Sequence, residues 1–284
     1  MRTWSPTRQP PGPATFRERE RAENFPVALS VLPHQLRADL RAVYRVVRSI
    51  DELGDSAPGD RTAQLTNFAA DLSAVWADGD PQAGILRELV PTVRRRGLGQ
   101  QPFQDLVLAN LQDQEVLSYR SFDELLQYCA LSAAPIGRLV LKVFGAAAPE
   151  LVLLSDQVCC GLQLVEHWQD VAEDRRAGRI YLPEEDRRHL AVRETDLDAD
   201  NACPALRRLV FFETGRTARM LDAGAPLVGQ LHGWARLAVA GYVAGGRAAV
   251  DSVHRVQGDV LGCTPRVRRR DVARHLLAEL RRAQ

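Results

Sequence analysis

Three acidic residues recur at intervals of four directly after a strongly apolar stretch of the chain. Glu166, Asp170 and Asp174 follow residues 151–165, which are rich in Leu and Val. An α-helix advances about 100° per residue, so a step of four drifts by only about 40° and keeps the carboxylates on one strip. A helix that is apolar around most of its girth is buried. The pattern therefore predicts an interior helix over about residues 149–178 that carries a line of carboxylates.

A second acidic set falls at the end of an earlier predicted helix, over about residues 35–53. Its apolar stripe continues onto Asp51 and, four residues later, onto Asp55, with Arg48 on the same side. Carboxylates at a helix C-terminus meet the unfavourable end of the helix dipole, and buried like charges need a compensating charge. Taken singly, either acidic pair also fits a solvated or ion-paired surface. Two inward-facing sets together favour a Mg²⁺ site that substrate phosphates complete, which is the chemistry of diphosphate departure.

The rest of the chain also reads as helical. Apolar residues recur at helical spacing and no alternating pattern typical of strands is present. Further helices are expected over 62–76, 81–96, 103–111, 123–133, 203–223, 226–244 and 268–282. The predicted fold is all-α, with one domain over residues 23–284. Residues 1–22 are rich in Pro, Arg and Glu and are predicted to form a disordered arm.

Composition excludes several classes of protein. The formal net charge of +1 gives no electrostatic reason to expect nucleic acid as a partner. The sequence contains no run of about 18 apolar residues, so no membrane span is predicted. Residues 1–23 lack the apolar core of a signal peptide. The five cysteines form no CxxC pair, which indicates reduced thiols and a cytoplasmic protein. The arginine runs at 94–96 and 268–270 are interpreted as solvated faces, with peripheral contact to anionic lipid headgroups as the alternative.

The two acidic sets resemble the motifs of the squalene/phytoene synthase family. The first motif is represented by Arg48 and the segment DELGD at 51–55. The second is represented by Gln163, the segment DVAED at 170–174 and GRIYLP at 178–183, and it is the more specific of the two. Two central segments are also similar, 119–125 and 128–138. The resemblance implies an isoprenoid-synthase-type helical bundle around a central cavity.

Within this family, residues 23–28 (ENFPVA) are similar to the start of the bacterial hydroxysqualene synthases of hopanoid biosynthesis. This resemblance implies Mg²⁺-dependent conversion of presqualene diphosphate to hydroxysqualene, without nicotinamide. The alternative is head-to-head condensation of two prenyl diphosphates to presqualene diphosphate, squalene or phytoene. A third alternative is a non-catalytic scaffold relative. An isoprenoid diphosphate is the expected substrate, and neighbouring pathway enzymes are the expected protein partners.

The family resemblance also implies roles for individual residues. The metal ligands would be Asp51, Asp55, Asp170 and Asp174, with Glu166 offering a further oxygen where the family usually has Asn. Arg48, Gln163, Arg179 and Tyr181 would contact the diphosphate or its waters, and Tyr181 is grouped with the four aspartates as catalytic. Phe25, Tyr44 and Tyr128 would line the pocket, and Tyr242 would close it. His167 is interpreted as a packing or supporting residue. Thr264-Pro265 replaces the usual Arg-Pro pair, which removes one expected diphosphate contact.

Overall fold

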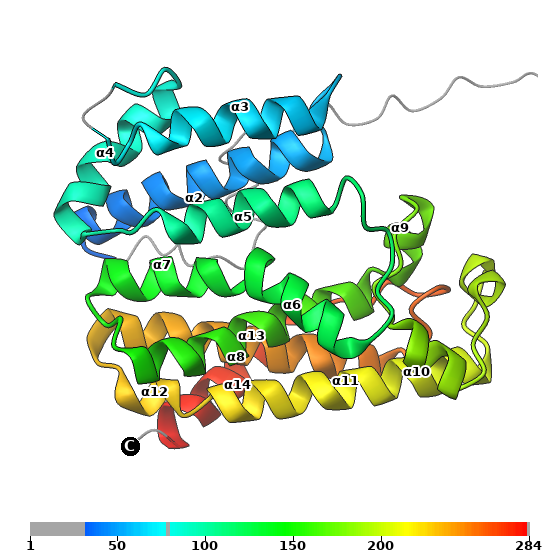
Figure 1. Ribbon diagram of the computed structural model, residues 1–284. Helices are drawn as coiled ribbons and strands as arrows, with labels where there is room; N and C mark the ends of the chain where they lie inside the picture. Colours follow the sequence, from blue (N-terminus) through cyan, green and yellow to red (C-terminus); the bar gives the residue numbers. More distant parts are fainter. Residues whose placement is uncertain (1–31, 78–79, 283–284) are drawn as a thin grey trace, which may run out of the picture.

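The computed structural model describes residues 32–77 and 80–282, and within these ranges the chain is built from helices (Figure 1). The only β pairing in these ranges is an isolated parallel bridge between Ser118 and Ile180. The all-α prediction is therefore confirmed. None of the helices in the described part is long and apolar enough to cross a bilayer. The predicted arm over residues 1–22 and Phe25 lie outside the described residues.

The helices predicted between residues 35 and 133 are all present, with ends shifted by a few residues. In chain order the elements are α2 (His34–Asp55), α3 (Arg61–Ser73), α4 (Gly84–Arg96), α5 (Gln101–Gln112), α6 (Phe122–Ser132), α7 (Ala134–Phe144), α8 (Pro149–Gln169), α9 (Val171–Arg176), α10 (Glu184–His189), the 3₁₀ helix η2 (Glu194–Asp198), α11 (Pro204–Gly224), α12 (Leu227–Gln230), α13 (Gly233–Arg255) and α14 (Arg269–Arg282).

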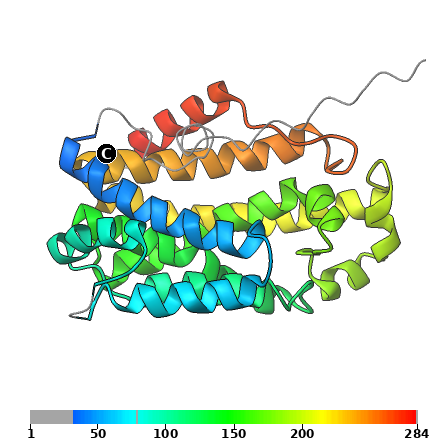
Figure 2. The same cartoon turned by 90° about the horizontal axis from the view of Figure 1, so that it is seen from above.

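The central helix of the bundle is α8, which packs against α7, α11 and α13. A second group forms around α2, which packs against α3, α4, α5 and α7, so that α7 joins the two groups. Figure 2 shows α13 and α14 along one side of the molecule and α3 along the other. The buried apolar side chains form three clusters, centred on α2, on the second half of α8 and on α13. This packing fixes the positions of the two helices that carry the acidic sets.

The long acidic helix predicted over residues 149–178 is not continuous. It ends as α8 at Gln169, and Asp170 adopts φ −103° and ψ 14° before α9 begins. The turn still carries hydrogen bonds on both sides, because the Asp170 N–H donates to the Glu166 carbonyl at 2.9 Å and the Asp174 N–H donates to the Asp170 carbonyl at 2.8 Å. Carboxylates spaced by four repel one another on a straight helix. A bend at the middle one relieves this repulsion.

The prediction of one helix over 226–244 is also wrong, because two helices occupy this range. The short α12 ends at Gln230, and α13 then runs to Arg255, beyond the predicted end at residue 244. Between them, Leu231 has ψ 157° and is almost completely buried in the cluster centred on α13. Burial of this side chain outweighs the local helical preference.

A buried ion cluster ties α10 to α11. Arg216 Nη2 donates to Asp186 Oδ1 at 3.2 Å, and its Nη1 donates to Glu213 Oε1 at 3.2 Å. The guanidinium carbon lies 4.5 Å from the centre of the Phe122 ring and 4.3 Å from that of Phe212. Both contacts add cation–π attraction. Because α10 directly follows the second motif, the cluster anchors the end of that motif.

This cluster predicts a pH dependence of stability. Burial raises the pKa of Glu213 from 4.5 to about 8, with Arg216 opposing the rise and Asp186 adding to it. A carboxyl group whose folded pKa is raised stabilises the fold below its unfolded pKa, and that contribution is lost as pH rises through the folded pKa. We therefore expect Glu213→Gln, which does not titrate, to gain melting temperature relative to wild type between about pH 5 and pH 9. A difference in melting temperature between the two proteins that stays constant from about pH 5 to pH 9 would contradict the raised pKa of Glu213.

Helices α8 and α11 approach closely at Gly224, so a methyl group added there is expected to destabilise the fold. A Cβ on Gly224 would lie 2.6 Å from Val158 Cγ2 and 2.8 Å from the Leu154 backbone oxygen. We expect Gly224→Ala to lower the free energy of unfolding by roughly 1–3 kcal/mol, because the backbone cannot give way. Gly215→Ala on the same helix is the control, since its nearest atom would be Arg219 Nη1 at 3.8 Å. Denaturant unfolding measures the free energy of unfolding of both variants. An equal loss in both would show that the close approach of α8 and α11 does not restrict residue 224.

Candidate active site

The second acidic set lies where α8 gives way to α9. Glu166 and Asp170 are exposed, whereas Asp174 is partly buried, so the prediction that this strip faces the interior is wrong for the first two. Partial desolvation raises the pKa of Asp170 to about 6, and repulsion from Asp174 and Glu173 adds to the rise. Oδ2 of Asp174 is buried and has no hydrogen-bond partner within the described residues. The surroundings of Asp170 therefore disfavour its negative charge.

An aromatic wall, formed by Tyr119, Tyr128, His167 and Tyr181, lies beside this set. The Tyr181 ring stacks on the imidazole of His167 with centroids 3.6 Å apart and an interplanar angle of 15°. The ring centroids of Tyr119 and Tyr128 each lie 5.9 Å from that of Tyr181. Burial lowers the pKa of His167 against the opposing effect of Asp174, and Gln163 Nε2 lies 3.2 Å from its Nε2. The interpretation of His167 as a packing or supporting residue stays a prediction. Stacked aromatic faces attract positive charge.

The first acidic set lies at the C-terminal end of α2, at the same end of the bundle as α9 (Figure 1). Asn110 Nδ2 donates to Asp51 Oδ1 at 3.5 Å. Arg179 Nη1 and Nη2 both donate to Asp55 Oδ1 at 3.2 Å. A Cβ on Gly54 would overlap the Asn110 side chain, so glycine is required for α5 to approach α2 here. The first set is therefore held by α5 on one side and by the second motif on the other.

Two residues link the acidic sets. Arg179, which follows α9, pairs with Asp55 across 124 positions of sequence. Asp113, which follows α5, accepts a hydrogen bond from the Tyr128 hydroxyl at 2.7 Å. Burial raises the pKa of Asp113 to about 6; the hydrogen bond from Tyr128 and the charge of Arg179 lower it, while Asp55 and Asp174 raise it further. Because Asp113 senses charge from both sets, the two sets share one region of the molecule.

The acidic residues do not form a closed metal cage. Among residues 32–77 and 80–282, no three metal-ligating side chains lie close enough together to hold an ion. Carboxylates are nevertheless suitable donors for Mg²⁺, which retains several waters and completes its shell with substrate phosphates. The buried Oδ2 of Asp174, which lacks a donor in the described part, fits this requirement. The residues present therefore fit a metal that binds together with an anionic substrate.

A small pocket lies against the second set. It is lined by residues of the second motif and its surroundings, among them His167, Asp174, Arg179 and Tyr181. The pocket brings a carboxylate, a guanidinium and two aromatic rings to the same surface. Its volume of about 10 Å³ is that of a single water molecule, so the pocket does not itself enclose a substrate.

The other predicted residues have more varied positions. Tyr44 is buried in the cluster centred on α2. Tyr242 is half-buried and packs against both that cluster and the one centred on α13. Arg48 is half-buried, and its Nε lies 3.5 Å from Glu52 Oε1 on the next turn. The roles of these residues toward a substrate remain predictions.

The sequence prediction omits Asp113 and Asn110. The signal is present, because Phe103, Leu106 and Asn110 follow the buried stripe of α5 at helical intervals and the next step falls on Asp113. The same reasoning identified Asp51 on α2. The aromatic wall had no such signal, since its members come from two separate helices and two connecting loops.

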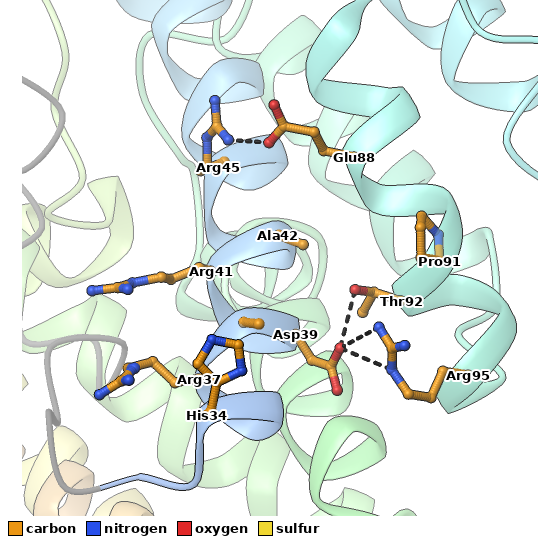
Figure 3. Close-up of a pocket in the computed structure, with 11 residues that line it drawn as sticks. His34, Arg37, Asp39, Arg41, Ala42, Arg45, Glu88, Pro91, Thr92 and Arg95 are labelled. Carbon is orange, nitrogen blue, oxygen red and sulfur yellow. Dashed lines mark hydrogen bonds and ion pairs between the residues drawn. The ribbon is translucent and has the colours of Figure 1, made fainter.

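A larger pocket of about 440 Å³ lies beside the N-terminal half of α2, against α4 (Figure 3). Its most buried polar residue is Asp39, which accepts hydrogen bonds from Thr92 Oγ1 at 3.2 Å and from Arg95 Nη2 at 3.0 Å. Arg96 Nε donates to the other carboxylate oxygen at 2.7 Å. Burial acts to raise the pKa of Asp39, but the hydrogen bonds from Arg96 and Arg95 lower it overall. We interpret this cluster as a structural tie between α2 and α4.

Comparison with known proteins finds related sequences and a related structure. A model of the squalene/phytoene synthase family matches residues 19–274, a range that includes both acidic sets. A hydroxysqualene synthase from Rhodopseudomonas palustris is 32% identical over 214 residues, which cover 74% of this chain and 72% of that protein. A phytoene synthase from Mycobacterium tuberculosis is 32% identical over 218 residues, covering 75% and 71%. The crystal structure of a squalene synthase from Alicyclobacillus acidocaldarius is 34% identical, with a TM-score of 0.79, and the match covers 85% of this chain and 91% of that one.

Proposed function

Because the chain belongs to the squalene/phytoene synthase family, we propose that it converts presqualene diphosphate into hydroxysqualene in a Mg²⁺-dependent reaction. The observation that carries the proposal is the position of the two acidic sets, which lie at one end of the bundle with Arg179 bonded to Asp55 beside them. The relative from R. palustris that is named hydroxysqualene synthase supports the choice of product.

The metal would be held by Asp51 and Asp55 from α2 and by Asp170 and Asp174 from the α8–α9 turn, with Glu166 as a further oxygen donor. When bound, Mg²⁺ neutralises the negative charge that develops on the departing diphosphate. The raised pKa of Asp170 and the buried oxygen of Asp174 support this role, since both carboxylates gain from a nearby cation.

The basic and aromatic side chains would bind the rest of the substrate. Arg179, already oriented by Asp55, would donate hydrogen bonds to diphosphate oxygens, with Arg48 and Gln163 as further donors. The C–O bond to the diphosphate breaks with both electrons leaving on oxygen, and the hydrocarbon remains as a carbocation against Tyr181 and the aromatic wall. After rearrangement, a water oxygen bonds to the cation and one proton is lost to solvent. The reaction therefore consumes no reductant.

The test is incubation of the purified protein with presqualene diphosphate and Mg²⁺ in the absence of NADPH. We expect hydroxysqualene and free diphosphate, identified by mass spectrometry and phosphate assay. A sample with EDTA in place of Mg²⁺ is the control. Folded protein that leaves presqualene diphosphate unchanged would contradict the proposal.

The second candidate is head-to-head condensation of two prenyl diphosphates. The observation that favours it is the match to the squalene synthase from A. acidocaldarius, which at 34% has a higher sequence identity than the R. palustris relative. The acidic sets serve either reaction, because both begin with departure of a diphosphate. Incubation with farnesyl diphosphate alone distinguishes the two reactions. Consumption of farnesyl diphosphate with formation of a C30 diphosphate or hydrocarbon supports condensation.

A further inference from the structure

Asp113 is a carboxylate that the two acidic motifs do not include. It is the C-cap of α5, where the negative end of the helix dipole disfavours a negative charge. Its Oδ2 accepts the hydrogen bond from Tyr128 at 2.7 Å. Its Oδ1 is buried and has no hydrogen-bond partner in the described part of the chain. Three unfavourable conditions thus meet at one side chain, namely burial, the helix end and an unsatisfied oxygen.

The surroundings of Asp113 add a fourth unfavourable condition. Asp55 and Asp174 both repel its charge, and Arg179 is the cation that offsets them. A carboxylate that served only to stabilise the fold would be paired directly, as Asp39 is with Arg95 and Arg96. Groups held at such a cost cluster at functional sites. The one direct donor to Asp113 that the structure shows is the Tyr128 hydroxyl, so the function of Asp113 should act through Tyr128.

Tyr128 is the member of the aromatic wall through which Asp113 connects to the others. Its ring centroid lies 5.4 Å from that of Tyr119, 5.9 Å from that of Tyr181 and 6.3 Å from that of His167. The hydroxyl is held by Asp113, so rotation of the whole side chain away from the wall would break this hydrogen bond. A negatively charged acceptor also polarises the phenol, which increases the electron density of the ring. A ring that is fixed and electron-rich attracts a neighbouring cation more strongly.

We infer that Asp113 is a positioning residue that fixes and polarises Tyr128, so that the aromatic wall stabilises the carbocation formed when the diphosphate leaves. This role rests on the proposed function, because it requires a carbocation at the site. It differs from the role of the acidic sets, since Asp113 would act through Tyr128 and not on the metal or the diphosphate. It predicts that loss of Asp113 slows the chemical step without weakening substrate binding.

The experiment compares three variants at the pair. Asp113→Ala removes both the acceptor and the charge, Asp113→Asn keeps a carbonyl acceptor without the charge, and Tyr128→Phe removes the donor. Asp105→Ala is the matched control, because Asp105 is also largely buried on α5 but accepts from Gln101 at 2.7 Å instead of from a tyrosine. The substrate is presqualene diphosphate or farnesyl diphosphate, whichever the wild type consumes. The rate of diphosphate release is measured, and the products are distinguished by mass spectrometry.

We expect Asp113→Ala to lower kcat about 10- to 100-fold, the usual effect of one hydrogen bond to a charged group, with KM within about threefold of wild type. Asp113→Asn should recover part of this loss, and Asp105→Ala should stay within about twofold. The double variant Asp113→Ala/Tyr128→Phe should be no slower than the slower single variant, because both remove the same interaction. A larger share of eliminated or unrearranged product should accompany the loss of kcat.

Each other outcome contradicts a particular claim. Wild-type kcat in Asp113→Ala, or losses that multiply in the double variant, would overturn the role of Asp113. A rise in KM with unchanged kcat would do the same, because it would indicate binding. If Asp113→Ala does not fold, the test rests on Asp113→Asn and Tyr128→Phe. A kcat equal to that of wild type in both variants would then overturn the role of Asp113. Wild-type protein that consumes neither diphosphate would instead contradict the proposed function, and this role with it.

Discussion

Replacing Asp170 by alanine is expected to lower kcat by at least about a thousandfold while leaving the helical circular dichroism unchanged. Asp170 lies at the bend between α8 and α9, where its side chain is exposed and forms no part of the apolar core. Its raised pKa shows that the protein alone does not favour its negative charge. Removing that charge should therefore leave the melting temperature of the metal-free protein equal or higher.

Glu173→Ala provides the matched control for this variant. Glu173 is an exposed acid on α9, three residues from Asp170, and it is not among the predicted metal ligands. We expect its loss to change kcat by no more than about threefold, because it would remove a surface charge and not a metal ligand. Loss of the fold in Asp170→Ala would show that the residue is structural. Equal losses of activity in both variants would show that only the general acidity of the turn matters.

Removal of divalent metal is expected to abolish turnover completely. After dialysis against EDTA, activity should return on addition of Mg²⁺, because the guanidinium groups of Arg48 and Arg179 alone do not balance the acidic sets and a leaving diphosphate. Arg179 is already bonded to Asp55 and Arg48 lies beside Glu52, whereas the two sets together carry four aspartates. Two guanidinium groups cannot replace the metal.

Metal binding should also be visible without an assay of activity. A ligand that binds only the folded state raises its stability, by about 2.7 kcal/mol at a concentration of one hundred times Kd. We expect Mg²⁺ together with inorganic diphosphate to raise the melting temperature of wild type and to have little effect on Asp170→Ala. Full activity in EDTA, or an equal shift in both proteins, would contradict the metal site.

The parts of the site that could be predicted are those that a single helix displays. Helical spacing alone predicts Asp51 and Asp55 on one side of α2, and the structure places both at the end of that helix. The prediction that both face inward is wrong for Asp55, which is exposed. The family assignment rested on contiguous motifs and is confirmed. Asp113 could have been found by the same extension along α5.

The remaining features depend on contacts between segments that are distant in sequence. The pairing of Arg179 with Asp55 spans 124 positions, and no local pattern in either segment specifies the other. The stack of Tyr181 on His167 requires the chain to turn back after α9. The helix is interrupted at Asp170, whereas the periodicity of the sequence describes a continuous helix. These are effects of packing and electrostatics in the assembled fold.

The central claim is that acids from α2 and from the α8–α9 turn hold the same metal cluster. A crystal structure of the protein soaked with Mn²⁺ and inorganic diphosphate tests it most directly, because Mn²⁺ replaces Mg²⁺ at oxygen sites and scatters anomalously. We expect anomalous peaks between the two sets, with at least one carboxylate of Asp51 or Asp55 and one of Asp170 or Asp174 coordinated directly or through a water, and diphosphate bridging them. Peaks confined to one set, with the other still turned toward solvent or Arg179, would contradict it.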